Sequence, residues 1–260
     1  MNEYAQAKRV CVNGHRYAVV SDHPESFAPL EDVERVLVGN LEGAQKVDES
    51  FKIIKEALKR YGPDNVALSF NGGKDCTVLL HLLYAARQAY ERENPSGKRT
   101  KIKTLYVAYT NSFPEVDDFV EFCVDRYNLE LVKMYGPMRA GLQVFLDRYP
   151  ETKAMLVGTR RTDPFGEHLQ PFQMTDPDWP TLMRVHPILD WNYADIWKGL
   201  ANLRIPYCIL YDLGYTSLGA IDNTIPNPAL VNPLQACGFD PAHRLADGCR
   251  EREGRKKRES

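Results

Sequence analysis

The residues of this chain best suited to chemistry lie at 68–76 and read Leu-Ser-Phe-Asn-Gly-Gly-Lys-Asp-Cys. The apolar run 66–70 predicts a buried strand, and it ends at the glycine pair Gly72-Gly73. Apolar residues at helical spacing follow at once, over 78–86. A strand, a glycine turn and a helix start together favour phosphate binding, because glycines admit the anion and the helix N-terminus presents N–H groups to it. The alternative is an ordinary tight turn.

The elements that would position this loop alternate between strands and helices. We predict a helix over 74–90, further strands at 102–108, 129–134 and 154–158, and a helix over 138–149. This order predicts an α/β fold with a doubly wound, mostly parallel, Rossmann-like sheet. Ligands of such sheets bind beyond the carboxyl ends of the strands, so the loop after residue 70 should meet the segments after 108 and 158 there.

Two helix starts have cap signals. Ser112-Phe113-Pro114-Glu115 has the pattern of a capping box before an apolar stripe that begins at Val116. Asn192 is a candidate N-cap for a helix that carries Ile196 and Trp197. These signals predict helices over about 114–127 and 193–203.

Composition limits the function classes. A net charge of −2 and a pI of about 6.3 give no basic field for nucleic acid. No apolar run is long enough to span a bilayer, so we expect no membrane partner. None of the six cysteines has Cys-x-x-Cys spacing, and no signal peptide is visible, which favours a reducing, cytoplasmic location. We expect a monomer that binds small molecules.

We divide the chain into three parts of one integrated catalytic domain. Residues 1–62 form an N-terminal lead-in, irregular up to about 30 and helical from Asp32 to Tyr61. Residues 63–160 form the nucleotide-binding core. Residues 161–260 are rich in proline and glycine, and we interpret them as a loop-rich substrate lobe.

The loop at 69–76 resembles the PP-loop of ATP pyrophosphatases, usually Ser-Gly-Gly-x-Asp-Ser, with Asn71 and Cys76 in place of the two serines. It fits neither a Walker A motif nor Gly-x-Gly-x-x-Gly. The segment 157–164, Val-Gly-Thr-Arg-Arg-Thr-Asp-Pro, is similar to the Gly-x-Arg-x-x-Asp-Pro signature of eukaryotic FAD synthetases. The segments 187–191 and 215–219 also fit that family, and the resemblance covers about 60–258.

This resemblance implies the adenine nucleotide alpha hydrolase-like fold, in its PAPS reductase-like branch. It implies an FMN adenylyltransferase that transfers AMP from ATP to the phosphate of FMN, giving FAD and pyrophosphate with Mg²⁺. Such a reaction depends on positioning and on cations, and it needs no Ser, His or Cys nucleophile.

The resemblance also implies site residues. Those assigned to nucleotide or flavin binding are Ser69, Phe70, Asn71, Gly72, Gly73, Lys74, Tyr109, Arg160, Arg161, Asp190 and Trp191. Those assigned to catalysis are Asn71, Asp75, Arg160, Asp163, Arg252 and Arg255, with Asp163 as the magnesium ligand. Backbone N–H groups at 72–74 would hold the pyrophosphate, and the arginines would face phosphates.

Each of these assignments has a structural alternative. Asp75 suits a helix cap as well as a metal link, and Asp163 suits a turn before Pro164. Asp190 suits a helix cap as well as an acceptor at the polar edge of the flavin, and Trp191 suits a core position as well as an aromatic wall for its ring. One of Arg160 and Arg161, and the whole basic C-terminal tail, could be solvated.

Other functions fit less well. A PAPS reductase needs a nucleophilic cysteine in a Glu-Cys-Gly-Leu-His-like motif, and Ala-Cys-Gly-Phe-Asp at 236–240 lacks the flanking Glu and His. A tRNA-thiolating enzyme needs paired cysteines and a basic surface. A non-catalytic nucleotide or flavin sensor would not need Asp75, Arg160 and Asp163 together.

Overall fold

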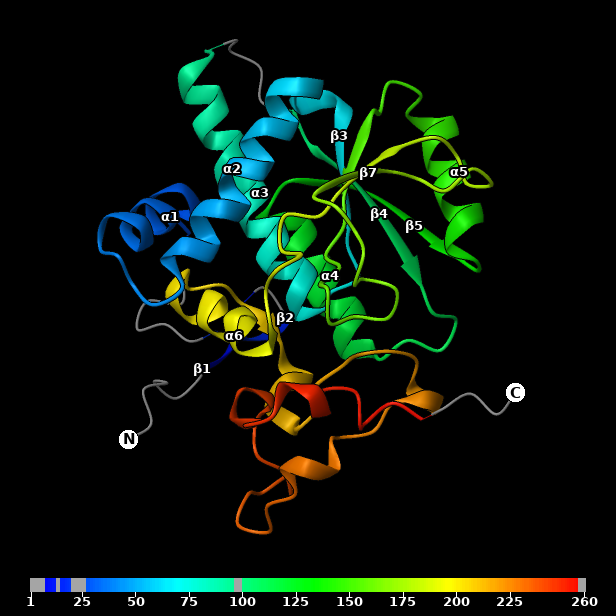
Figure 1. Cartoon of the computed structure of the whole chain (residues 1–260). Helices are drawn as coiled ribbons and strands as arrows, with labels where there is room; N and C mark the ends of the chain where they lie inside the picture. Colours follow the sequence, from blue (N-terminus) through cyan, green and yellow to red (C-terminus); the bar gives the residue numbers. More distant parts are fainter. Residues whose placement is uncertain (1–7, 13–14, 20–26, 96–99, 257–260) are drawn as a thin grey trace.

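A six-stranded sheet forms the centre of the protein in the computed structural model, which describes residues 8–12, 15–19, 27–95 and 100–256 (Figure 1). Its strand order is β5-β4-β3-β6-β8-β7. The strands are β3 (Val66–Ser69), β4 (Ile102–Ala108), β5 (Leu129–Tyr135), β6 (Ala154–Leu156), β7 (Phe172–Met174) and β8 (Met183–Val185). All neighbours pair in parallel except β7, which runs antiparallel to β8. The predicted mostly parallel sheet is confirmed.

Helices cover both faces of this sheet. The face with Val66 and Leu68 packs against a large core to which most helices contribute, whereas Ala67, between them, packs on the other face against Leu142 and Phe145 of α5. The helices are α1 (Pro29–Val38), α2 (Ala44–Tyr61), α3 (Lys74–Glu93), α4 (Pro114–Arg126), α5 (Met138–Arg148) and α6 (Tyr193–Asn202). This alternation of side chains along a strand explains why the apolar run 66–70 is buried from both sides.

The predicted capping box at 112–115 is wrong. α4 starts at Pro114 with Phe113 as its N-cap, and no side chain caps it. The Ser112 hydroxyl instead donates to the Tyr109 carbonyl at 2.7 Å. Phe113 is buried, so core packing fixes how the chain enters this helix. The predicted cap at Asn192 is confirmed, and its partner in a complete capping box is Asp195.

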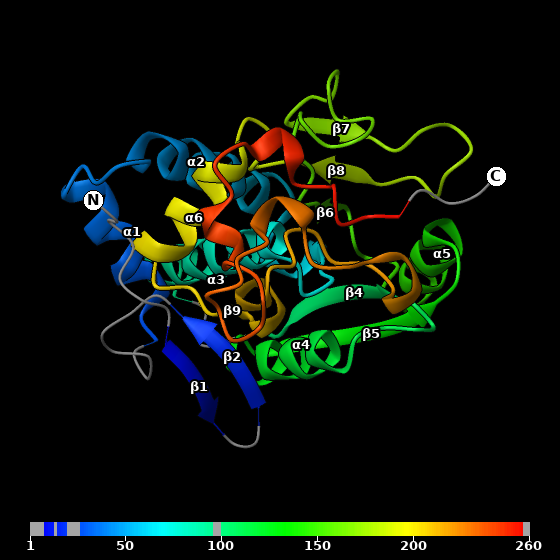
Figure 2. The same cartoon turned by 90° about the horizontal axis from the view of Figure 1, so that it is seen from below.

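The N-terminal part is not irregular throughout, as the sequence suggested. β1 (Lys8–Val12) and β2 (His15–Val19) form an antiparallel hairpin, and β2 also pairs with β9 (Tyr207–Cys208) (Figure 2). The remaining residues of the predicted 1–30 lead-in up to Ser26 lie outside the described residues. The sequence does carry a hairpin signal here, Asn13-Gly14 between two strand-like runs, whereas the pairing with β9, far along the chain, has no local signal.

The C-terminal part is built mainly of loops and short 3-10 turns. Among these, η2 (Ile209–Leu213) follows β9 directly, and η6 (Gly248–Arg250) introduces the last described segment. The strands β7 and β8 were not predicted, because prolines interrupt the sequence around them. Within the described residues, no helix combines the length and the apolarity that crossing a membrane requires.

Candidate functional site

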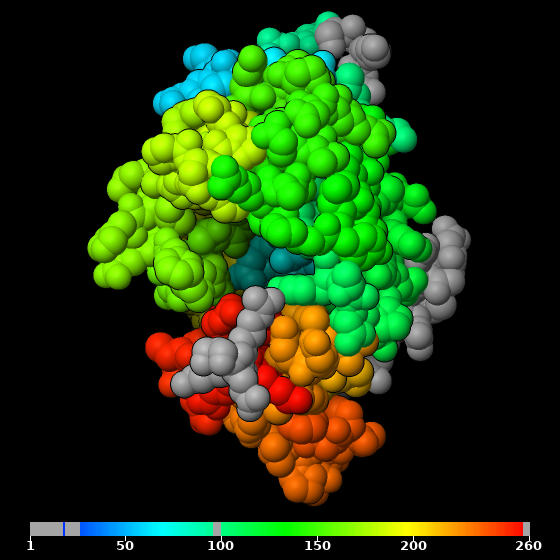
Figure 3. All heavy atoms as spheres, turned by 90° about the vertical axis from the view of Figure 1, so that its right-hand side faces the viewer, coloured from blue at the N-terminus to red at the C-terminus, as the bar shows by residue number. Residues whose placement is uncertain are grey.

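A cavity of about 380 Å³ opens beyond the carboxyl ends of β3, β4 and β6. Its walls come from stretches within 69–76, 106–116, 157–163 and 211–219, and from residues near the C-terminus. Figure 3 shows this hollow, with green residues of the sheet half above it and orange and red residues of the C-terminal part below. The three strand ends that the sequence predicted to meet do lie together.

Most of the predicted site residues line this cavity. They are Ser69, Phe70, Asn71, Gly73, Lys74, Asp75, Tyr109, Arg160, Asp163, Arg252 and Arg255. Gly72 acts through the backbone, since its φ of +72° is the left-handed region that favours glycine, and a Cβ there would lie 3.1–3.2 Å from Val116 and Val120. The loop therefore needs glycine at this turn.

Two loop N–H groups that the sequence assigned to pyrophosphate already have partners inside the protein. The Gly73 N–H donates to Asn71 Oδ1 at 2.9 Å, and the Lys74 N–H donates to the Tyr211 hydroxyl at 2.9 Å. Burial raises the pKa of Tyr211 well above its ordinary value, so this hydroxyl stays protonated. A phosphate oxygen that takes either N–H must first displace Asn71 or Tyr211.

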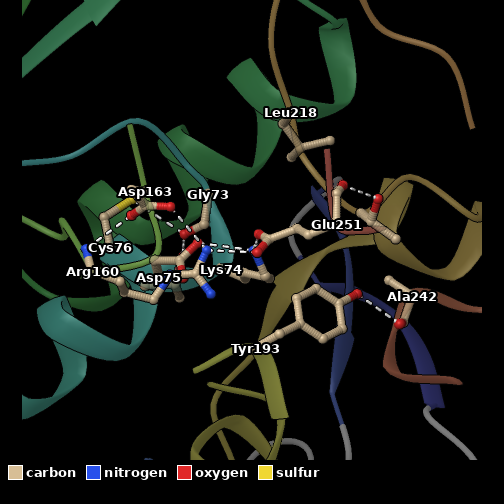
Figure 4. Close-up of polar contacts among 12 residues, drawn as sticks. Gly73, Lys74, Asp75, Cys76, Arg160, Asp163, Tyr193, Leu218, Ala242 and Glu251 are labelled. Carbon is tan, nitrogen blue, oxygen red and sulfur yellow. Dashed lines mark hydrogen bonds and ion pairs between the residues drawn. The ribbon is translucent and has the colours of Figure 1, made fainter. Parts of the chain in front are cut away.

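At the loop lies a cluster of five charged side chains, of which Lys74, Arg160 and Glu251 are buried and Asp75 and Asp163 are partly exposed (Figure 4). Lys74 Nζ pairs with Asp75 at 3.0 Å and with Glu251 at shorter range. Arg160 pairs with Asp75 at 3.0 Å, with Asp163 at 3.1 Å and with Glu251 at 2.7 Å. Two cations thus face three carboxylates, which leaves the cluster with one excess negative charge.

The two cations control the protonation of this cluster. Burial alone would raise the pKa of Asp75, but Lys74 and Arg160 outweigh it and hold that pKa below its ordinary value. Burial alone would lower the pKa of Arg160, but the surrounding carboxylates raise it above its ordinary value. Asp75 and Arg160 therefore stay charged near neutral pH. Arg160 Nε lies 3.0 Å from Asp75 Oδ1, whereas Nη1 is buried without a hydrogen-bond partner among the described residues, which leaves this guanidinium donor capacity.

Asp163 combines a turn role with a place at the cavity wall. Its Oδ2 accepts the Arg160 backbone N–H at 2.8 Å, while Oδ1 accepts from the same guanidinium at 3.1 Å. Its side chain is 24% exposed, and that of Asp75 is 21% exposed. Asp163 therefore does stabilise the turn that was its structural alternative. Both Asp163 and Asp75 still reach the cavity.

Arg161 does not line the cavity. Its guanidinium pairs with Asp190 at 2.5 Å and donates to the carbonyls of Glu167 and Leu169. Of the two adjacent arginines, only Arg160 faces the cavity, because successive residues after β6 point in different directions. Arg161 instead holds the 161–170 loop in place.

Asp190 and Trp191 also lie outside the cavity wall. Trp191 is buried in the core, where its indole N–H donates to the Ser50 hydroxyl at 2.9 Å. Asp190 is exposed and bound to Arg161, and its carbonyl accepts from Lys46. This geometry corrects the expectation that Trp191 walls the flavin, because a side chain packed in the core offers no face to a ligand.

The C-terminal segment does reach the site, as the resemblance implied. The Arg255 guanidinium donates to the Leu218 carbonyl at 2.7 Å and lies so close to Gly219 that a Cβ there would be 2.4 Å away. Arg252 is exposed at the cavity wall, and no other side chain in the described part of the chain pairs with its guanidinium. Arg252 is thus a cation available to an anionic ligand.

Cys76 is a structural thiol. It donates to Asn71 Oδ1 at 2.7 Å, and burial raises the pKa of this thiol to about 12. A thiol with that pKa carries almost no thiolate near neutral pH. The site therefore performs no chemistry that needs a nucleophilic sulfur at this position.

Sequence reasoning missed two residues of the site, Glu251 and Tyr211. Both contact Lys74 from the C-terminal half of the chain. Nothing in their local sequence marks them, apart from the position of Glu251 directly before Arg252. Only the fold, which brings the last turn against the phosphate loop, identifies them.

The arrangement suits the transfer of a phosphoryl-type group between anions. Arg160, Arg252 and Arg255 converge on one cavity, and two carboxylates at its wall are the hard oxygen donors that a divalent cation prefers. In the described part of the chain, no group of three or more His, Cys, Asp or Glu side chains could hold a metal ion by itself. The remaining ligands of any such ion would come from substrate and water.

Comparison with known proteins gives one family. The phosphoadenosine phosphosulfate reductase domain matches residues 65–145 and 140–226. The probable FAD synthase of Schizosaccharomyces pombe is 44% identical over 207 residues, covering 79% of this chain and 77% of the relative. The probable FAD synthase of Caenorhabditis elegans is 41% identical over 82% of this chain, but the match spans only 40% of that longer relative.

Among solved structures, the FMN adenylyltransferase of Candida glabrata in complex with FMN and the ATP analogue AMPCPP has a TM-score of 0.78. It is 30% identical and covers 88% of this chain and 96% of its own.

Proposed function

Because the chain belongs to the FAD synthase family, a branch of the phosphoadenosine phosphosulfate reductase domain group, we propose that it is an ATP:FMN adenylyltransferase. It transfers AMP from ATP to the phosphate of FMN. A phosphate oxygen of FMN bonds to the α-phosphorus of ATP, the bond from that phosphorus to the α–β bridging oxygen breaks, and pyrophosphate leaves with its electron pair. The products are FAD and pyrophosphate, and no proton needs to be removed from the nucleophile, because the phosphate of FMN is mostly dianionic near neutral pH.

The observation that carries this proposal is the convergence of three arginines on a cavity without a reactive thiol or histidine. Bringing a phosphate dianion to a triphosphate is opposed by charge, so cations held in place must supply most of the catalysis. We assign Arg160 to the phosphates of ATP, and Arg252 and Arg255 to the phosphate of FMN. Asn71 and the amides of Gly73 and Lys74 receive the pyrophosphate once their internal partners are displaced.

Mg²⁺ fits the donor set at the cavity wall. Asp163, and after it Asp75, would hold the ion, because both carboxylates reach the cavity and the charged cluster has one excess negative charge. When bound, the ion would neutralise charge on the phosphates. Arg160 and the turn at 160–163 keep Asp163 in place for this role.

The direct test is to incubate the protein with ATP, MgCl₂ and FMN and to separate the flavins by chromatography. We expect FAD and pyrophosphate in equal amounts. A parallel reaction with PAPS and a thiol reductant should give no sulfite. Sulfite from PAPS together with unchanged FMN would overturn the proposal and favour a reductase.

A further inference from the structure

Glu251 has contacts that its exposed neighbours lack. Its side chain is only 10% exposed, although Arg252 and Glu253, the next two residues, are exposed. Its two oxygens are used separately: Oε1 accepts from Lys74 Nζ, and Oε2 accepts from Arg160 Nη2 at 2.7 Å. One carboxylate thus bridges the first residue of α3 and the segment after β6 (Figure 4).

The backbone around Glu251 is held from another side. The Thr216 hydroxyl donates to the Glu251 carbonyl at 2.6 Å, and the Asn227 amide donates to the Arg250 carbonyl at 2.8 Å. Farther along, the Ile225 N–H donates to the Gly254 carbonyl. These bonds attach the segment 250–254 to the loop 216–227, which is itself part of the C-terminal half.

The Glu251 side chain joins this assembly to the two cations of the phosphate-binding half, Lys74 and Arg160, which belong to the loop and to the strand end assigned to the nucleotide. A second link, from the Ile221 N–H to the Asn111 carbonyl, lies on the loop 216–227 and not on the segment that carries the arginines. Arg252, the residue after Glu251, lines the same cavity. The ion pairs of Glu251 therefore fix the part of the assembly next to Arg252.

We propose that Glu251 is a positioning residue that sets where Arg252 and Arg255 meet the phosphate of FMN. The inference rests on the proposed adenylyltransferase function and adds to it a residue that acts through its ion pairs with other residues. Its role lies in its two simultaneous ion pairs. A side chain at position 251 that keeps one of these ion pairs and loses the other would let the C-terminal segment shift against the phosphate loop.

The sign of the effect separates this role from a simple charge effect. A carboxylate beside a site for two polyanions repels them, so removing its charge would tighten phosphate binding if its field were all that mattered. Removing a positioning carboxylate must instead weaken FMN binding, because the arginines are no longer held in place. The two ideas predict opposite changes in the KM for FMN.

The test compares Glu251→Gln with Glu253→Gln, a matched control two residues away. Glu253 is exposed and pairs with Arg250 at the surface, so its loss should leave both KM values unchanged. We expect Glu251→Gln to raise the KM for FMN about tenfold, the scale of one charge-assisted contact, with the KM for ATP changed by no more than about twofold. An unchanged or lower KM for FMN in a folded Glu251→Gln protein overturns the proposal.

A double-mutant cycle checks that the effect passes through the arginines. If Glu251 acts by placing Arg252, then Glu251→Gln in an Arg252→Ala background should raise the KM for FMN by less than about twofold more. Independent, additive losses would mean that Glu251 acts elsewhere, and this outcome would refute the positioning role.

Two further measurements keep the test decisive. Thermal unfolding shows whether Glu251→Gln folds. If it does not, Glu251→Asp takes its place, because it keeps the charge but is one methylene too short to bridge both cations. It should show the same rise in the KM for FMN, with little change in the KM for ATP. FMN fluorescence titration in the presence of AMPCPP measures binding without turnover. Wild-type protein that binds FMN but makes no FAD would refute the adenylyltransferase, whereas equal FMN affinity of wild type and Glu251→Asp would refute the positioning role alone.

Discussion

Replacing Asp163 by asparagine separates the two tasks of its carboxylate. The side-chain carbonyl of Asn can still accept the Arg160 backbone N–H, which Asp163 accepts at 2.8 Å, so the turn should persist. The charge that faces the cavity is lost. We expect turnover to fall about 100-fold or more, the scale of losing one preorganised charge-stabilising group.

Asp163→Ala is the matched comparison, because it removes both the charge and the acceptor. Losing one hydrogen bond of this kind costs about 1 kcal/mol. For a chain of this size, that lowers the melting temperature by about 2–4 °C. Asp163→Asn should therefore match Asp163→Ala in turnover but match wild type in melting temperature.

The assay is steady-state FAD formation over a range of MgCl₂ concentrations, with thermal unfolding measured on the same samples. Near-normal turnover of Asp163→Asn at saturating MgCl₂ would refute the reasoning and reduce this residue to a turn former. If Asp163→Ala lost turnover and Asp163→Asn did not, the reasoning would also be refuted, because only the hydrogen bond from the Arg160 backbone N–H would then matter.

Four further outcomes are expected. Cys76→Ser should keep most of the FAD synthesis, because the thiol is buried and protonated; complete loss in a folded variant would point to thiol chemistry. Tyr211→Phe removes the acceptor of the Lys74 N–H, so the kcat/KM for ATP should change about tenfold, while the KM for FMN, measured in parallel, should not. Trp191→Phe should lower the melting temperature and leave the KM for FMN unchanged; the reverse pattern would restore it as a flavin contact. Burial lowers the pKa of His81 from 6.5 to about 3, so the unfolded chain binds more protons between these values, and stability should fall as the pH drops from 6.5 toward 3; His81→Gln should flatten this part of a pH series of unfolding curves.

The strands β3 to β6 were predicted from sequence patterns within their own segments. The strand 102–108 was predicted with the bounds that the structure has, because a buried strand between polar turns is an unambiguous pattern. The hairpin at 8–19 was missed although its sequence holds a local signal, since Asn13-Gly14, a dipeptide typical of hairpin turns, separates its two strands. Only its pairing with Tyr207–Cys208, which is distant in sequence and two residues long, leaves no local trace.

The residues of the site also fall into two groups, those that a sequence motif marks and those that only the fold identifies. The phosphate loop and Asp163 carry motifs, and both line the cavity. Side-chain direction carries no motif: Arg160 and Arg161 are adjacent and chemically identical, yet only the first reaches the site. Trp191 was predicted to be a flavin contact, with a core position as the alternative, and its packing against α6 places it in the core. Residues that act on other residues, as Glu251 does, can be recognised only when the fold is known.

The ion pair between Lys74 and Glu251 joins residues 177 positions apart in the chain. During synthesis the phosphate loop and α3 emerge long before Glu251, so Lys74 at first has only Asp75, its neighbour in the chain, as a carboxylate partner. Burying an ammonium that lacks one of its two carboxylates is less favourable, so this side chain should stay in water until Glu251 is present. Folding of the phosphate site is therefore expected to be a late step, because it depends on a contact of long sequence separation.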